Sequence, residues 1–113
     1  MKNLTIYHNP RCSKSRQALE LLKNQGLEPN VVEYLKEPLN YEQLTALRAH
    51  IALKDLVRTN EKCFKELALS LDDEVRVLNA MTHEPKLMQR PIVVYRNKAA
   101  VGRSPQNILD ILS

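Results

Sequence analysis

The chain has 113 residues, which is enough for one domain and leaves no room for a second. Hydrophobic residues make up 43% and charged residues 27%, a balance typical of a folded globular protein rather than a disordered one. No apolar run approaches the roughly 20 residues that a membrane helix needs, and no signal peptide opens the chain. Only two cysteines are present, Cys12 and Cys63, so we expect a reduced, cytoplasmic protein that does not bind membranes.

The charge is mildly basic, with 17 Lys and Arg against 13 Asp and Glu, a net charge of +4. A nucleic-acid binder usually concentrates its basic residues on one stripe and adds aromatic side chains. Here the basic residues are spread along the chain and only 4% of residues are aromatic. The charge therefore fits attraction of a small anion at least as well as a polyanion, and we expect no nucleic-acid partner.

The first third of the chain predicts a strand, a helix and a second strand. Residues 4–7 and 31–34 are β-prone runs. Between them we expect a helix with Ser13 or Ser15 as its N-cap and Gly26 at its C-terminal end. Its apolar face consists of Ala18, Leu19, Leu21 and Leu22. This order and spacing indicate a βαβ unit with parallel strands and a right-handed crossover.

The middle of the chain is expected to be helical. Asn40 and Gln43 match a capping box at the start of one helix. An amphipathic stripe at helical spacing follows, formed by Phe64, Leu67, Ala68 and Leu71. Asp72 can cap a further helix, whose apolar positions are Val75, Leu78 and Met81.

After Pro91 the pattern predicts two strands, over residues 92–95 and 99–101, joined by a turn. A last helix should begin with Ser104 as N-cap and Pro105 in its first position. Its buried face is expected to contain Ile108, Leu109, Ile111 and Leu112. The whole order predicts an α/β fold with a small mixed sheet and flanking helices, as in the thioredoxin fold. A fold alone does not indicate a function.

Cys12 stands between the first predicted strand and the first predicted helix, where backbone N–H groups favour an anion. A helix N-terminus stabilises a charge by only about 0.3–1 kcal/mol, so cationic neighbours must contribute if Cys12 is to be a thiolate. Four basic side chains are close in sequence, namely His8, Arg11, Lys14 and Arg16. The alternative is a half-buried cysteine in a basic loop, but the strand–turn–helix setting favours a reactive thiol.

Ser15 occupies the position at which a dithiol motif would have its second cysteine. Cys12 cannot form a disulfide there, so a catalytic cycle would need an external thiol. Cys63 lies beside Phe64 on a predicted amphipathic helix, and we expect it to be a packed or half-exposed bystander.

Three other kinds of site find little support in the sequence. A phosphate-binding loop needs glycines that are missing between the first strand and the first helix. The phosphatase signature would require an arginine where Ala18 stands. His8 and Cys12 are two possible metal ligands without the remaining one or two, so we expect no metal site.

Four separated motifs stand at the boundaries of the predicted elements. They are HNPRCSKSR at residues 8–16, LVR at 56–58, QRPIVV at 89–94 and GRSP at 102–105. In order and spacing they resemble the glutaredoxin-dependent arsenate reductase family, over nearly the whole chain. The resemblance implies one domain over residues 1–113, with a thioredoxin-like fold and a helical insertion between its βαβ and ββα halves.

The resemblance also implies a site. Cys12 would be the nucleophile that attacks arsenate, and His8 would help to hold it as a thiolate. Arg58, Arg90 and Arg103 would hold the anion, since a guanidinium can bind two oxygens of a tetrahedral oxyanion at once. The peptide between Arg90 and Pro91 would be cis. Taken singly, each arginine has an alternative: a solvated helix residue, a strand-edge charge and a cap-region charge, respectively.

The implied cycle uses outside thiols, in keeping with the serine at position 15. Cys12 displaces an arsenate oxygen, glutathione attacks the adduct, and glutaredoxin removes the glutathione as a mixed disulfide while arsenite is released. Glutathione is then a co-substrate and glutaredoxin a partner, with no tightly bound cofactor and a monomeric protein. Well-studied relatives have Gly-Thr after the cysteine. This chain has Ser13-Lys14, which adds a charge that can alter oxyanion affinity or substrate choice.

Two alternative functions stay open. Spx-type transcription regulators share this fold and bind RNA polymerase, but their redox-sensing members have a cysteine where Ser15 stands here. A general glutathione-dependent thiol transferase would use the same thiol on mixed disulfides without arsenate.

Overall fold

The computed structural model describes residues 3–113, which form two compact units. The first unit comprises the chain up to Tyr34 and the segment Arg90–Ser113, and the second comprises Leu35–Gln89. The first two residues of the predicted domain lie outside the described part. No helix within residues 3–113 has the length and apolar character that crossing a membrane requires.

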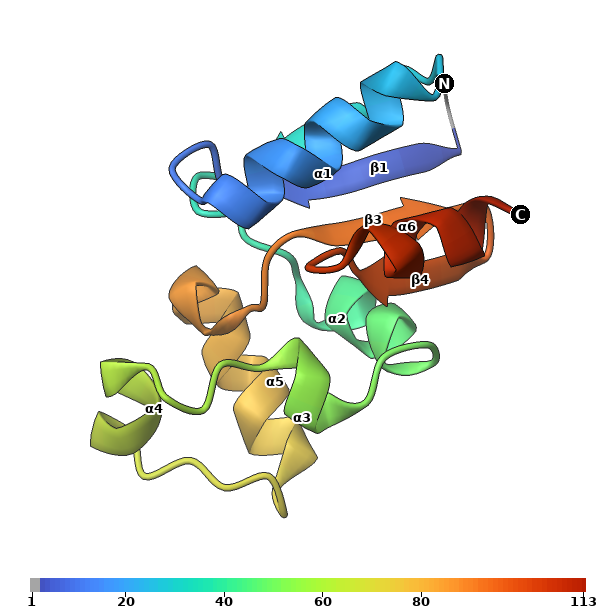
Figure 1. Ribbon diagram of the computed structural model, residues 1–113. Helices are drawn as coiled ribbons and strands as arrows, with labels where there is room; N and C mark the ends of the chain where they lie inside the picture. Colours follow the sequence, from blue (N-terminus) through green and yellow to red (C-terminus); the bar gives the residue numbers. More distant parts are fainter. Residues whose placement is uncertain (1–2) are drawn as a thin grey trace. The chain divides into compact units, whose positions relative to one another are not determined.

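The first unit opens with the predicted βαβ arrangement (Figure 1). Strand β1 spans Leu4–His8, helix α1 spans Ser13–Asn24 and strand β2 spans Asn30–Glu33. β1 and β2 run parallel, with Ile6 opposite Val31. The predicted strand, helix and strand are confirmed, with strand ends that differ by one residue from those expected.

Of the predictions for the two ends of α1, the one for its start is wrong and the one for its end is confirmed. The helix begins directly after Cys12, whose extended backbone makes it the N-cap residue. The prediction that Ser13 or Ser15 caps the helix is wrong, because both serines already lie in its first turn. At the other end Gly26 has φ 78°, the left-handed conformation common after a helix, so it ends α1 as predicted.

The second part of the first unit is a hairpin followed by a helix. β3 spans Ile92–Tyr95, β4 spans Lys98–Val101 and α6 spans Pro105–Leu112. β3 pairs antiparallel with both β1 and β4, which gives a four-stranded mixed sheet in the order β2-β1-β3-β4. Ser104 is the N-cap of α6, and the Arg90–Pro91 peptide is cis, as expected.

Helices α1 and α6 pack on one face of this sheet (Figure 1). Their shared core is made of buried residues from β1, α1, β3 and α6, namely Leu4, Ile6, Ala18, Leu22, Val93, Ile108 and Ile111. Of the positions expected to be buried on α6, Leu109 is instead 37% exposed, because it projects to the side of the helix away from this core. The packing fixes the N-terminal ends of both helices relative to the sheet.

The second unit is the predicted helical insertion between β2 and β3. Its helices are α2 (Tyr41–Arg48), α3 (Leu53–Leu56), α4 (Lys62–Glu66) and α5 (Glu74–His83), followed by the 3-10 helix η1 (Pro85–Leu87). The capping box of Asn40 and Gln43 is present as predicted. With this insertion, the chain has the α/β, thioredoxin-like order expected from the sequence.

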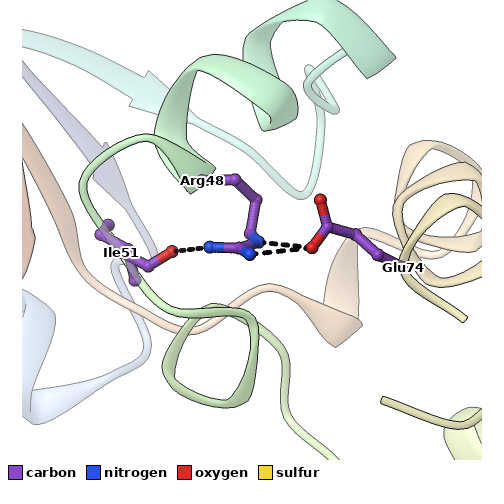
Figure 2. A network of polar contacts seen from close by, with 3 residues as sticks. All are labelled: Arg48, Ile51 and Glu74. Atoms are coloured by element: carbon purple, nitrogen blue, oxygen red, sulfur yellow. Dashed lines mark hydrogen bonds and ion pairs between the residues drawn. The ribbon is translucent and has the colours of Figure 1, made fainter. Parts of the chain in front are cut away.

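A polar network ties α2 to the start of α5 (Figure 2). The Arg48 guanidinium donates to the Ile51 carbonyl at 2.9 Å and also binds the Glu74 carboxylate, at 2.9 Å from Nε and 2.8 Å from Nη2. The arginine therefore offsets the charge of Glu74 and provides a hydrogen-bond donor for the Ile51 carbonyl, where the two helices meet.

The predicted helical stripe from Phe64 to Leu71 is wrong. Helix α4 ends with Leu67 as its C-cap, and Ala68 has φ 50°, in the left-handed region. The side chain of Arg76 donates to the carbonyls of Leu67 at 2.7 Å and Ala68 at 3.2 Å. In a longer helix these two carbonyls would accept backbone N–H groups; here the Arg76 side chain is their donor instead.

Helix α5 begins one residue later than its expected cap implied. Asp73, rather than Asp72, is the N-cap, and its carboxylate accepts a backbone N–H of the first turn at 3.3 Å. Leu78 and Met81 are buried as expected, whereas Val75 is 59% exposed. The apolar spacing thus predicted the helix but assigned one residue to the wrong face.

Candidate active site

Cys12 lies in a short loop whose backbone is held by hydrogen bonds. The Cys12 N–H donates to the Asn9 carbonyl at 3.0 Å, and the Arg16 N–H donates to the Cys12 carbonyl at 3.0 Å. The Asn9 side chain also accepts the Arg11 N–H at 3.0 Å. The loop therefore holds the half-buried thiol at the start of α1, where free backbone N–H groups point out of the helix.

The surroundings of Cys12 favour its thiolate. Burial raises the pKa of the Cys12 thiol, but the backbone N–H groups of Ser15 and Lys14 lower it, and so do a hydrogen bond and the charge of Arg90. The net result is a pKa below that of an ordinary cysteine. A thiolate is the form that acts as a nucleophile, so the lowered pKa suits this cysteine to covalent chemistry.

Arg90 lies beside this cysteine and is itself contacted by Arg103. The Arg103 guanidinium donates from Nη1 to the Arg90 carbonyl at 3.2 Å, while the Arg90 side chain interacts with the thiol. The Nε atom of Arg90 is buried and has no hydrogen-bond partner among residues 3–113. A buried donor without a partner is rare in folded proteins, so this N–H group is a candidate contact for a bound anion.

His8 contacts Ser15 at the end of β1. Its Nδ1 atom lies 2.6 Å from the Ser15 hydroxyl oxygen, which also accepts the Asn9 N–H at 3.0 Å. Burial lowers the pKa of His8; Glu33 opposes this, and Arg16 and Lys23 add to it. The lowered pKa favours the neutral imidazole, whose Nδ1 atom contacts the Ser15 hydroxyl.

Ser15 was predicted only as a possible helix cap and as the absent second thiol. It is fully buried and joins three segments, because it binds the end of β1 and the loop while it sits in α1. The sequence carries a signal for this position: Ser15 shares the inward face of the helix with Ala18 and Leu22. A polar residue on an apolar face must find a buried partner.

Arg58 belongs to the second unit. Its backbone N–H donates to the Leu87 carbonyl at 2.7 Å, next to an isolated antiparallel bridge, so it is not a solvated helix residue. Its guanidinium forms an ion pair with the Glu61 carboxylate at 2.6 Å. The first unit thus holds His8, Cys12, Arg90 and Arg103, and the part of Arg58 in a shared site remains a prediction.

Cys63 lies in α4 and its surroundings have the opposite effect. Burial raises the pKa of its thiol, and the carboxylates of Glu84 and Glu61 raise it further. Nearby backbone N–H groups lower it, but the net pKa is raised.

Within residues 3–113 there is no cluster of three or more His, Cys, Asp or Glu side chains that could hold a metal ion.

Residues 7–111 match the sequence profile of the ArsC family. The chain belongs to the ArsC family. It is 46% identical to the uncharacterized protein YfgD of Escherichia coli K12, over 98% of each chain. It is also 40% identical to an arsenate reductase of Neisseria meningitidis serogroup B, over 99% of this chain and 100% of that one.

Among solved structures, an arsenate reductase from Vibrio cholerae superimposes on this ArsC-family chain with a TM-score of 0.88 and 40% identity, covering 96% of both chains. The family resemblance and the thioredoxin-like α/β fold predicted from the sequence are therefore confirmed.

Proposed function

We propose that this ArsC-family protein reduces arsenate to arsenite, with Cys12 as the nucleophile and with glutathione and glutaredoxin as the source of electrons. The observation that carries the proposal is the state of Cys12. Although burial raises the pKa of this thiol, the N–H groups of Ser15 and Lys14 together with Arg90 lower it overall. Relatives that cover the whole chain are named arsenate reductases, which supports the same chemistry here.

The first step is attack of the Cys12 sulfur on arsenic. A sulfur–arsenic bond forms, an arsenic–oxygen bond breaks, and the departing oxygen takes up protons and leaves as water. Both reactants are anionic, so cationic donors must offset their repulsion. The buried Nε–H of Arg90, which has no partner among the described residues, would gain an arsenate oxygen as its acceptor.

The other two arginines complete the proposed anion site. Arg103 is anchored through one Nη atom to the Arg90 carbonyl, which leaves its other N–H groups for an oxygen of the substrate. Arg58 would contribute the third guanidinium after exchanging its bond with Glu61 for one with arsenate. Guanidinium groups suit this task because they stay charged and present two parallel donors.

His8 would support the thiolate through position rather than charge. Its contact with Ser15 fixes the first turn of α1, and the N–H groups of that turn are the ones that lower the pKa of Cys12. We therefore assign His8 as a positioning residue that acts through Ser15.

The cycle closes with two outside thiols. Glutathione displaces a second oxygen and leaves arsenic bonded to the sulfurs of Cys12 and glutathione. A glutaredoxin thiolate then attacks the glutathione sulfur to form a mixed disulfide, and the electron pair of the broken sulfur–arsenic bond reduces arsenic to the trivalent state. Water then releases arsenite and restores Cys12.

The same proposal makes the protein a one-domain monomer that acts in the cytoplasm, where these thiols are kept reduced. It requires no tightly bound cofactor, because each electron comes from a thiol.

The test is arsenate-dependent NADPH consumption with glutathione, glutaredoxin and glutathione reductase. Cys12→Ser should abolish consumption, whereas the matched variant Cys63→Ser should retain it. Replacing glutaredoxin with thioredoxin and its reductase should leave little activity. Consumption driven by a mixed disulfide without arsenate would instead indicate a thiol transferase. No reductase activity together with capture of RNA polymerase would indicate a regulator.

A further inference from the structure

A shallow hollow lies between α1 and α6, beside the start of both helices. Its cavity volume is only about 20 Å³, room for about one water-sized group, and the rest of the hollow is open to solvent. Its lining includes the polar side chains of Lys14, Gln17 and Arg103. It also includes the apolar side chains of Ala18, Leu21 and Ile108. All of them belong to the first unit, so the hollow is formed within one compact part of the chain.

The hollow and the reactive thiol share the N-terminal end of α1. Cys12 is the N-cap of α1, and Lys14 lies in the first turn that follows it. Lys14, Gln17 and Leu21 recur at helical spacing, so the wall formed by α1 runs from a charged end near Cys12 to an apolar end. Arg103 stands on the opposite wall, in front of α6.

The side chain of Lys14 has no task in the site described above. Its backbone N–H lowers the pKa of Cys12, but its side chain is exposed and forms no hydrogen bond or ion pair within the described residues. With Arg103 it places two cations at the mouth of the hollow, and Gln17 adds an amide that can donate or accept.

These groups match an organic carboxylate better than a second inorganic anion. An inorganic tetrahedral anion has no apolar part, whereas the floor of the hollow is formed by aliphatic side chains. A peptide-like ligand can place a carboxylate between the two cations and its methylene groups on that floor.

We propose that this hollow is the subsite for a carboxylate of the thiol co-substrate, with Lys14 and Arg103 as its cationic contacts and Gln17 beside them. The inference rests on the proposed function, since it concerns glutathione reaching Cys12. In glutathione the glycine carboxylate is one residue away from the thiol, a span of about 3.3–3.6 Å per residue. Lys14 lies in the first turn of α1, the helix that Cys12 caps.

The test uses a reaction without arsenate. The Cys12 thiolate attacks oxidised glutathione, a protein–glutathione disulfide forms, and reduced glutathione leaves. Its rate is compared with that of hydroxyethyl disulfide, which has no carboxylate, by mass spectrometry. Lys14→Gln should slow the reaction with oxidised glutathione about two- to fivefold more than that with the neutral disulfide, the range of an exposed ion pair. Added salt should shrink this difference.

Lys23→Gln, in the last turn of the same helix, is the matched control and should not change the ratio of the two rates. In the coupled assay, Lys14→Gln should raise the KM for glutathione and leave the KM for arsenate unchanged. An unchanged ratio of exchange rates, or a shift confined to the KM for arsenate, would overturn the subsite. Failure of the wild-type protein to reduce arsenate would overturn the proposed function alone, because the exchange reaction still reports on the hollow.

Discussion

Cys12 in the first unit and Cys63 in the second invite comparison, because both are half-buried and both stand at the start of a helix. Burial raises the pKa of each thiol. Around Cys12 the backbone N–H groups of α1 and the charge of Arg90 outweigh burial. Around Cys63 the carboxylates of Glu84 and Glu61 add to it.

The comparison teaches that a helix start is not enough to activate a thiol. Backbone N–H groups favour the anion at both cysteines, yet the two pKa values shift in opposite directions. A helix terminus contributes about 0.3–1 kcal/mol, which neighbouring carboxylates can cancel and a neighbouring guanidinium can reinforce. The charge that tertiary packing brings to the sulfur therefore decides which cysteine reacts.

Removing the guanidinium should have the largest effect. Arg90→Gln removes a cation that lowers the pKa of Cys12, and it removes a donor to the developing charge of the oxyanion. We expect arsenate reduction to fall about 10²–10³-fold, as for the loss of one oxyanion donor. Arg90→Lys keeps the charge without the paired donors and should fall between this variant and the wild type. Steady-state kcat/KM values would measure both, and an unaltered rate in Arg90→Gln would contradict the role of this residue.

The comparison can also be measured directly by alkylation. Because its pKa is lowered, Cys12 carries a larger thiolate fraction at neutral pH than an ordinary cysteine, and it loses that thiolate as the pH falls through the lowered pKa. The raised pKa of Cys63 delays its thiolate to higher pH. With iodoacetamide at pH 7 we expect Cys12 to react at least about tenfold faster, since rate follows the thiolate fraction. Peptide mass spectrometry over a pH series gives both profiles, and equal rates would refute the contrast.

A third change tests how the first unit supports its cysteine. Ser15→Ala leaves the Asn9 N–H and the His8 ring without their buried partner. It should cost about 1–3 kcal/mol of unfolding free energy. It should also move the alkylation profile of Cys12 to higher pH, which loss of stability alone would not do. The control is Ser13→Ala, an exposed serine in the same turn, with a change within about 0.5 kcal/mol. Denaturant titration and alkylation together distinguish the two roles.

The smallest effect is expected in the second unit. Glu61→Gln removes a carboxylate that raises the pKa of Cys63, and it releases Arg58 from its ion pair. Alkylation of Cys63 should speed up about twofold, and the KM for arsenate should fall by a similar factor if Arg58 then binds substrate freely. Glu66→Gln, on the same helix, is the control because this carboxylate pairs with Lys62 instead. A higher KM for arsenate in Glu61→Gln would contradict the proposed exchange.

The sequence by itself determined the features that neighbouring residues encode. β1, α1 and β3 follow from β-prone runs, apolar spacing and the left-handed Gly26, and the capping box at Asn40 follows from its own four residues. The choice of Cys12 followed from its place between a strand and a helix, and the three arginines followed from the family resemblance. Those patterns depend on neighbouring residues, so they can be predicted without knowing which segments pack against them.

Only the tertiary structure decided which groups meet. The sequence offers Ser13 or Ser15 as a helix cap, whereas the fold places Ser15 against His8. Helix α4 stops at Leu67, whose carbonyl accepts a bond from the Arg76 side chain of the next helix, α5. The guanidinium beside Cys12 comes from Arg90, the first residue after the helical insertion. A thiol's pKa depends on charges a few ångströms away, and chain folding, rather than sequence spacing, sets those distances.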